Sequence, residues 1–216
     1  MLAEFTGVSA LEELTALVKR ADFPVVDHWA EVGGWFREWA ARPELRKELR
    51  AHIDGLTPQQ ATWVIARSRE TTTHFAWCLR DEPGEQFTFW LHEYKPLADW
   101  RTGYADSVHN HRYHFCTTIL SGAYLHERFD ARLGVGGRSI ISTELTKRTQ
   151  CVAGTTGTLL AHEFHRIPRA ADGTMTFLVK SRAVTPWSLS YDPDTGISHR
   201  HVPVEERLED LTNNLM

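Results

Sequence analysis

The sequence predicts a mainly β protein, a small antiparallel β-barrel preceded by α-helices. In the first quarter of the 216-residue chain, apolar residues recur three or four positions apart, which is the period of an amphipathic helix. From about residue 72 onward, short β-prone runs alternate with Gly, Pro or Asp. Their spacing of roughly 8 to 12 residues is typical of an all-β sandwich or barrel.

Four segments near the N-terminus predict helices. Ser9 and Glu12 have the spacing of a capping box at the start of the first one. The stretch WAEVGGWFREWA, residues 29–40, places its aromatic side chains on one face, which we expect to be buried as core. RPELRKELRAHIDG, residues 42–55, predicts a short charged helix, and TPQQ, residues 57–60, has the cap and the proline of another helix start.

The β part begins with a predicted hairpin. HFAWCLRDEPGEQFTFWLHEY, residues 74–94, is two β-prone runs joined by the turn-rich DEPGE. Further runs are HFCTTIL, AYLHERFD, RSIISTEL, GTLLAHEF, MTFLVKSR and WSLSYD, and the tail PVEERLEDLTNNL predicts a surface helix. We therefore expect an N-terminal helical segment over 1–70, packed on a barrel over 71–204, and a C-terminal tail over 205–216.

The composition argues against several classes of function. The formal net charge is −4, so the chain has no basic field for nucleic acid. No apolar run approaches the roughly 20 residues of a membrane helix, and the N-terminus does not read as a signal peptide. The cysteines Cys78, Cys116 and Cys151 are odd in number and sparse, which fits a reducing compartment. We expect a cytoplasmic monomer or homodimer that binds neither nucleic acid nor membranes.

Two histidine clusters are candidates for a metal site. HNHRYHF, residues 109–115, contains His109 and His111, and residues i and i+2 of a strand point to the same face. Both can therefore enter the interior of a barrel, whereas His114 breaks the parity and is expected in a loop or outside. A third ligand must come from elsewhere in the chain, and AHEFHRIP, residues 161–168, is the only comparably dense source.

These clusters resemble the two motifs of the cupin superfamily. HNHRYHFCTTILSG is similar to the first motif, two histidines followed by a strand that ends at a glycine, here Gly122. GTTGTLLAHEFHRI is similar to the second, in which a glycine precedes the third metal histidine by eleven residues, here Gly154 and His165. Cupins usually add a glutamate seven residues before the first glycine, and this chain has Phe115 there. That absence points to the cysteine dioxygenase-like group, a resemblance that covers roughly residues 60–196.

The resemblance implies a cupin-type barrel, a double-stranded β-helix, whose metal is held by His109, His111 and His165. Fe(II) is the expected metal, although imidazole ligands also suit Zn, Ni, Cu or Mn. The leading hypothesis is a mononuclear non-heme Fe(II) oxygenase or dioxygenase that takes a small polar metabolite and dioxygen. The alternatives are a redox-neutral metal-dependent cupin (isomerase, lyase or hydrolase) and a non-catalytic cupin that binds a small molecule.

The substrate-binding residues depart from that family. The family's carboxylate-binding arginine falls on Trp77, so we expect Trp77 in the substrate site and free cysteine to be a poor substrate. The family has an active-site Ser, His and Tyr at alternating positions of one strand, and these positions fall on Thr176, Leu178 and Lys180. The resemblance implies that this face of the strand points toward the metal. Lys180 would then bind an acidic group of the substrate or donate a proton. A shift of one residue in register would instead turn it to solvent.

Other residues are candidates for supporting roles. His126, on the strand after Gly122, is expected to be a partner of a ligand or a fourth ligand. Cys116 lies next to the predicted metal site, where we expect it to contact substrate as a small buried hydrophobe. Candidates to replace the family's arginine are Arg67, Arg69 and Arg80.

Overall fold

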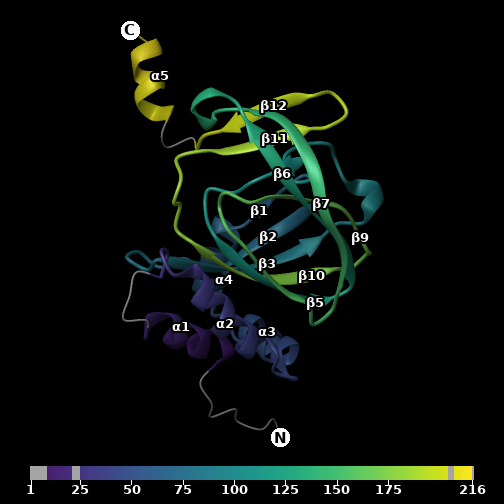
Figure 1. The fold of residues 1–216 in the computed structure, drawn as a ribbon. Coiled ribbons are helices and arrows are strands. Elements are labelled where there is room, and N and C mark those ends of the chain that lie inside the picture. The colour runs from purple at the N-terminus through teal and green to yellow at the C-terminus, as the bar shows by residue number, and fades with distance from the viewer. Residues whose placement is uncertain (1–8, 21–24, 204–206, 216) are drawn as a thin grey trace, which may run out of the picture.

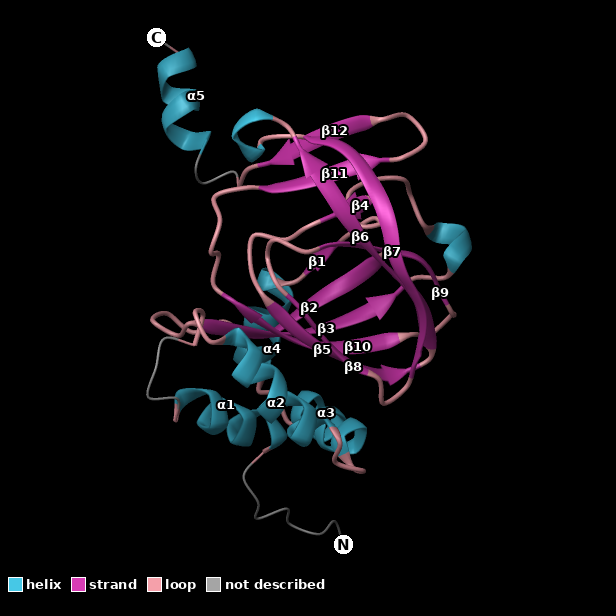
Figure 2. Ribbon diagram, in the orientation of Figure 1, coloured by secondary structure: helices cyan, strands magenta, loops and turns pink. Residues whose placement is uncertain are grey.

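The computed structural model describes residues 9–20, 25–203 and 207–215. Helices lie at both ends of a β body (Figures 1 and 2). They are α1 (Ala10–Lys19), α2 (Trp29–Ala40), α3 (Leu45–Asp54), α4 (Pro58–Arg67) and α5 (Leu208–Asn214), with short 3-10 turns η1 (Leu97–Asp99) and η2 (Val135–Gly137). The strands are β1 (Arg69–Glu70), β2 (His74–Arg80), β3 (Phe87–Tyr94), β4 (Val108–His109), β5 (Phe115–Ser121), β6 (Ala123–Leu133), β7 (Ile140–Val152), β8 (Thr156–Leu159), β9 (Phe164–Ala170), β10 (Met175–Ser181), β11 (Ser188–Asp192) and β12 (Ile197–His201).

The strands form two six-stranded sheets whose pairings are all antiparallel. The first sheet has the order β1-β2-β3-β10-β5-β8, and the second has the order β12-β11-β4-β9-β6-β7. The prediction of a mainly β, antiparallel fold with N-terminal helices is confirmed. Within the described part of the chain, no helix combines the length and the apolar composition needed to cross a membrane.

The predicted helix starts are found with their capping hydrogen bonds. The Ser9 hydroxyl accepts from the backbone N–H of Glu12, and the Glu12 carboxylate accepts in return from the N–H of Ser9. Thr57 and Gln60 form the same reciprocal box at the start of α4. Each box satisfies backbone donors that the first helical turn leaves without an intrahelical partner. The predicted tail helix is α5, while residues 204–206 of that segment lie outside the described residues.

The first sheet separates a helical core from a cavity because its side chains alternate between two faces. On β10, Phe177 and Val179 are fully buried in the core beneath α1 and α2, and the Phe177 ring lies 5.0 Å from that of Trp39. The alternate residues Thr176, Leu178 and Lys180 face the other way and line a cavity. Burial of one phenylalanine of this kind contributes about 1.5–3 kcal/mol. The helices in Figure 1 therefore support the sheet from the side opposite the cavity.

Helix α2 approaches the first sheet closely at a glycine. A Cβ atom placed on Gly33 would lie 2.8 Å from the hydroxyl oxygen of Thr158 on β8, which is closer than real side chains come. Gly34, one residue later, would meet nothing within 4 Å. The two adjacent glycines therefore differ in role, since only Gly33 permits the contact between α2 and β8.

The strands differ from the expected ones in three places. β4 ends at His109, so His111 lies beyond the strand on which the parity argument had placed it. The run GTLLAHEF is not one strand: β8 ends at Leu159, and β9 begins at Phe164 after a turn. β1, at 69–70, is a strand within the stretch 1–70 that was expected to be helical.

Candidate metal centre

Residues of both sheets line one cavity of about 830 Å³. Its walls are rich in threonine and histidine, and no aspartate or glutamate of the described chain lines it. The cationic side chains in the lining are Arg69, Arg128, Lys147 and Lys180. The lining also contains apolar side chains such as Phe115, Leu159 and Leu178, so the cavity suits a small ligand that carries both polar and apolar groups.

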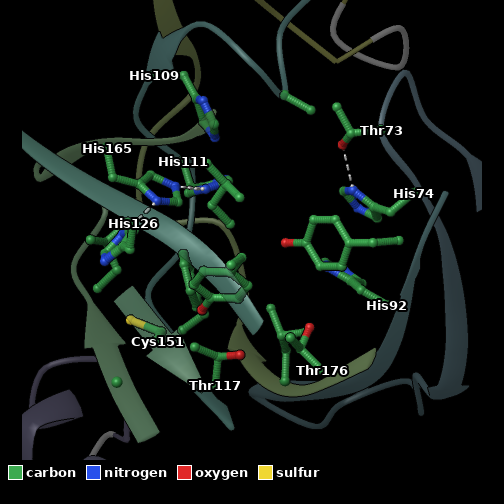
Figure 3. A pocket seen from close by; sticks show the side chains of 18 of the residues that line it. Thr73, His74, His92, His109, His111, Thr117, His126, Cys151, His165 and Thr176 are labelled. Carbon is green, nitrogen blue, oxygen red and sulfur yellow. Dashed lines mark hydrogen bonds between the residues drawn. The ribbon is translucent and has the colours of Figure 1, made fainter. Parts of the chain in front are cut away.

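His109, His111 and His165 converge on one side of this cavity (Figure 3). One ring nitrogen from each lies within 4.8 Å of the other two. His109 closes β4 directly opposite His165 on β9, so the ladder of the second sheet places these two rings together. His111 comes from the bend after β4, and its Nε2 atom lies 2.9 Å from Nε2 of His165.

Hydrogen bonds orient two of these rings from behind. Nδ1 of His109 lies 2.8 Å from the carbonyl oxygen of Ser107, to which it can only donate. Nδ1 of His165 lies 3.0 Å from Nε2 of His126. In His109 the donating Nδ1 leaves Nε2 as the acceptor, which is the arrangement typical of metal-binding histidines, and His165 has the same arrangement in the tautomer whose Nδ1 donates to His126.

Asn110 fixes the bend that carries His111. Its amide nitrogen donates to the carbonyl of Ala161 at 2.9 Å, and its amide oxygen accepts from the backbone N–H of Leu189 at 2.7 Å. The hydroxyl of Tyr104 donates to the backbone carbonyl of Asn110. These bonds tie the bend to β11 and to the turn before β9, so His111 is held without a strand of its own.

The three rings are in the protonation state that a metal requires. Burial lowers the pKa of His109 to about 4. Burial, followed by the charge of His109, lowers the pKa of His111 and of His165 well below the ordinary range. All three imidazoles are therefore neutral near pH 7, and a neutral imidazole is the form that binds metal.

The spacing of one pair of these nitrogen atoms, those of His111 and His165, fits two neighbouring ligands of a metal ion. Two nitrogens bound to one ion at about 2.0–2.1 Å and at right angles to each other lie about 2.9 Å apart. This is the separation between Nε2 of His111 and Nε2 of His165. His126 is not part of the converging group, and its Nε2 faces Nδ1 of His165 from outside that group.

Lys180 lies inside the cavity, with only 4% of its surface exposed. Its Nζ atom lies 4.3 Å from the centre of the Trp90 ring, 5.3 Å from that of Tyr113 and 3.4 Å from Nε2 of His92. Burial, followed by the charge of Arg69, lowers the pKa of Lys180 well below its ordinary value. Thr176, on the same face of β10, is 2% exposed and also lines the cavity.

Sequence reasoning did not identify a second histidine pair in the cavity. His74 and His92 stack with ring centres 4.2 Å apart, and Nδ1 of His74 lies 2.9 Å from the Thr73 hydroxyl. Figure 3 shows this pair across the pocket from His109, His111 and His165. The hairpin register, which pairs Ala76 with His92, was the available signal, because it puts both histidines on one face.

Two residues expected to contact substrate lie outside the cavity. Trp77 alternates to the helix-facing side of β2, where its indole N–H donates to Glu93 at 3.2 Å. Cys116 is fully buried on the helix-facing side of β5, with its Sγ atom 3.6 Å from the hydroxyl of Thr158. Burial raises the pKa of the Cys116 thiol to about 12, so it remains protonated. Strand parity explains both corrections.

Of the three candidate arginines, only Arg69 lines the cavity. Arg67 pairs with Asp81 at 2.8 Å, and Arg80 pairs with Glu85 on the outside of the hairpin. The expectation that free cysteine is a poor substrate rested on the lack of an arginine in the substrate site. Because Arg69 lines that site, this reason no longer applies.

The chain was compared with known proteins. No family model matches it, and no curated protein matches it. Similar solved structures include oxalate decarboxylase from Bacillus subtilis, with 16% identity and a TM-score of 0.37 over 55% of this chain and 28% of that one. The oxalate decarboxylase of Lactobacillus farciminis, in a formate complex, has 18% identity and a TM-score of 0.37 over 55% and 31%. KdgF from Halomonas sp. has 12% identity and a TM-score of 0.36 over 53% and 85%. The chain thus covers less than a third of the oxalate decarboxylases that it matches.

Proposed function

We propose that this protein is a mononuclear metal-dependent enzyme of the cupin type, with His109, His111 and His165 as the metal ligands. The observation that carries the proposal is the convergence of these three neutral rings, of which His109 and His165 are buried and His111 is half-buried, with two nitrogens at the 2.9 Å spacing of adjacent ligands. The hydrogen bonds that hold Nδ1 of His109 and of His165 support it further.

The metal we propose is Fe(II), and the reaction is that of an oxygenase or dioxygenase with a small polar metabolite and dioxygen as substrates. His109, His111 and His165 would hold such an ion, which would supply the Lewis-acid and redox chemistry that reactions of dioxygen need. A ligand set without a carboxylate is what the histidine motifs share with the cysteine dioxygenase-like group. Ni, Cu or Mn are the other metals that imidazole ligands suit, and Zn in the purified protein would point instead to redox-neutral chemistry, because Zn does not change its oxidation state.

The surrounding residues would prepare the site for such a reaction. The rings of Tyr113 and Phe115 each lie 5.1 Å from that of His111 and form an apolar wall beside it. This wall keeps water from part of the space next to the ligands, and a drier site strengthens the interactions of charged groups within it. His126 would hold the orientation of His165, and Lys180 would place its amine, whose pKa is lowered by burial, in the cavity.

The decisive test begins with metal analysis of protein purified without chelators. Dioxygen consumption is then measured after loading with Fe(II), against a panel of thiols (cysteine included), amino acids and hydroxy acids. We expect about one metal ion per chain and oxygen uptake that depends on one class of substrate. Turnover under nitrogen at the same rate would identify a redox-neutral enzyme, and metal binding without any turnover would favour a binding protein.

A further inference from the structure

The charges lining the cavity are all of one sign. The chain as a whole carries a formal net charge of −4, but the described residues that line the cavity include four cations and no carboxylate. Arg128 is balanced by Glu163, which lies 2.7 Å away outside the lining. Lys147 and Arg69 are both exposed on edge strands, β7 and β1, but Arg69 lies against the Trp90 ring that Lys180 also contacts. The two cations that remain are Arg69 and Lys180.

Lys180 is buried without an opposite charge. Within the described residues its nearest polar contact is the ring nitrogen of His92 at 3.4 Å, and its ammonium otherwise faces the rings of Trp90 and Tyr113. A buried charge is costly unless it is paired, and aromatic faces compensate only part of that cost. A lysine in this setting is stabilised when an anion enters the cavity.

Arg69 and Lys180 share one aromatic ring. The guanidinium carbon of Arg69 lies 5.0 Å from the centre of the Trp90 ring, and Nζ of Lys180 lies 4.3 Å from the same centre. The charge of Arg69 is close enough to lower the pKa of Lys180. Two cations held against one ring repel each other, and an anion between them would turn that repulsion into two attractive interactions.

We propose that Arg69 and Lys180 together form an anion subsite that binds a carboxylate of the substrate. This inference rests on the proposed function and names its substrate class as carboxylic acids. Phosphate sites in proteins commonly add free backbone N–H groups, from glycine-rich loops or helix starts, to the Arg and Lys side chains that bind the anion. Here Arg69 and Lys180 lie within strands: Arg69 is paired with Ala76, and Lys180 is paired with Thr88 and Phe115. Their side chains alone therefore face the cavity. The two oxygens of one carboxylate are enough to accept from both side chains.

The subsite lies close enough to the three histidines to serve one small molecule. The Tyr113 ring centre is 5.3 Å from Nζ of Lys180 and 5.1 Å from the ring centre of His111. Tyr113 therefore links the two parts of the cavity. A short carboxylic acid with its carboxylate at Lys180 can reach the metal centre with its other end.

The test uses the full chain, with metal removed, and compares succinate with its neutral isostere succinamide by calorimetry and by thermal shift. Succinate should bind and raise Tm, whereas succinamide should not. Arg69→Gln and Lys180→Met should each weaken succinate binding at least about tenfold, the scale of one charge-assisted hydrogen bond. Arg67→Gln is the matched control, because Arg67 lies two residues away and pairs with Asp81 outside the cavity. If Lys180→Met does not fold, Arg69→Gln on the short strand β1 decides alone.

Equal binding of succinate and succinamide would overturn the subsite, as would unchanged affinity in the Arg69 and Lys180 variants. Inorganic phosphate that binds more tightly than succinate would overturn the assignment to carboxylates. Removing metal separates this inference from the proposed function. Succinate binding that depends on Arg69, in a protein that takes up no metal, would leave the subsite standing and refute the metal enzyme. Metal uptake with substrate-dependent turnover but no carboxylate binding would support the metal enzyme and refute the subsite.

Discussion

The Nε2 atom of His126 lies 3.0 Å from the Nδ1 atom of His165, so one histidine aims the other at the cluster of ring nitrogens. We expect His126→Ala to lower metal affinity by about 10–100-fold, the usual cost of losing such a partner, without abolishing binding. His126→Gln, which keeps an acceptor, should restore part of the loss. Competition with a chelator measures both affinities. The exposed His162, just before β9, gives the control His162→Ala, and equal affinity in all these variants would remove His126 from the site.

A second prediction separates ligand from bystander among the histidines. His165→Ala should reduce metal content from about one ion per chain to near zero, because two imidazoles rarely hold a divalent metal against competition from buffer. His114→Ala should leave the content unchanged, since Nδ1 of His114 accepts from the N–H of Ala161 away from the cluster. Elemental analysis of both proteins decides the matter. Loss of metal in the His114 variant alone would refute the proposed ligand set.

The adjacent glycines of α2 should respond in opposite ways. Gly33→Ala should lower the free energy of unfolding by about 1–2 kcal/mol, because its methyl group would meet the Thr158 hydroxyl at 2.8 Å. Gly34→Ala should raise it by about 0.5–1 kcal/mol, since alanine favours the helix and nothing obstructs the new atom. Urea unfolding followed by circular dichroism measures both values. A destabilised Gly34 variant or a stabilised Gly33 variant would contradict the packing of α2 on β8.

The stability of the metal-free protein should fall as the pH drops from about 6.5 to about 4. Burial lowers the pKa of His109 from 6.5 to about 4 and that of His74 to about 3. Between these values the unfolded chain binds more protons than the folded one, so acid favours unfolding. For His109 alone the full loss amounts to about 3 kcal/mol. Denaturant unfolding at a series of pH values measures the slope.

His74→Phe provides the control for this pH dependence. The phenyl ring can stack on His92 as the imidazole does but cannot titrate, so the slope between pH 6.5 and 4 should become shallower. A slope equal to that of the parent protein would show that His74 does not contribute. Stability that is independent of pH over this range in the parent protein would contradict the neutral state of these buried rings.

Local sequence patterns predicted much of the fold because they act over short distances. Ser9 and Thr57 predicted helix starts because each forms hydrogen bonds with the residue three positions later, and the DEPGE turn predicted the β2–β3 hairpin. The position of His111 could not be predicted from such short-range patterns. The strand ends before it, and its ring reaches the cluster because Asn110 is bonded to Ala161 and Leu189, which are remote in sequence.

The candidate site was predictable only where its residues lie in a dense motif. His109, His111 and His165 belong to two histidine-rich stretches, whereas His74, His92 and Arg69 are single residues of strands that become neighbours through pairing. Trp77 and Cys116 were predicted on the wrong face of the first sheet. The face on which a side chain lies depends on its odd or even position along the strand, so a shift of one residue reverses it. Register across a sheet depends on long-range pairing, which a single sequence specifies weakly.

The side chains of β10 alternate between the helical core and the cavity, and this affects how the ligand specificity of the protein can change by mutation. Phe177 and Val179 hold the helical layer, while Thr176, Leu178 and Lys180 face the ligand space. Mutations at the second set can alter which molecule is accepted while leaving the apolar contacts that secure the helices intact. Leu178 belongs to both sets of constraints, because it lines the cavity and also packs in an apolar cluster with Trp90 and Phe115. A library randomised at Thr176 should therefore retain a larger folded fraction than one randomised at Phe177 and Val179, and a library randomised at Leu178 should fall between them.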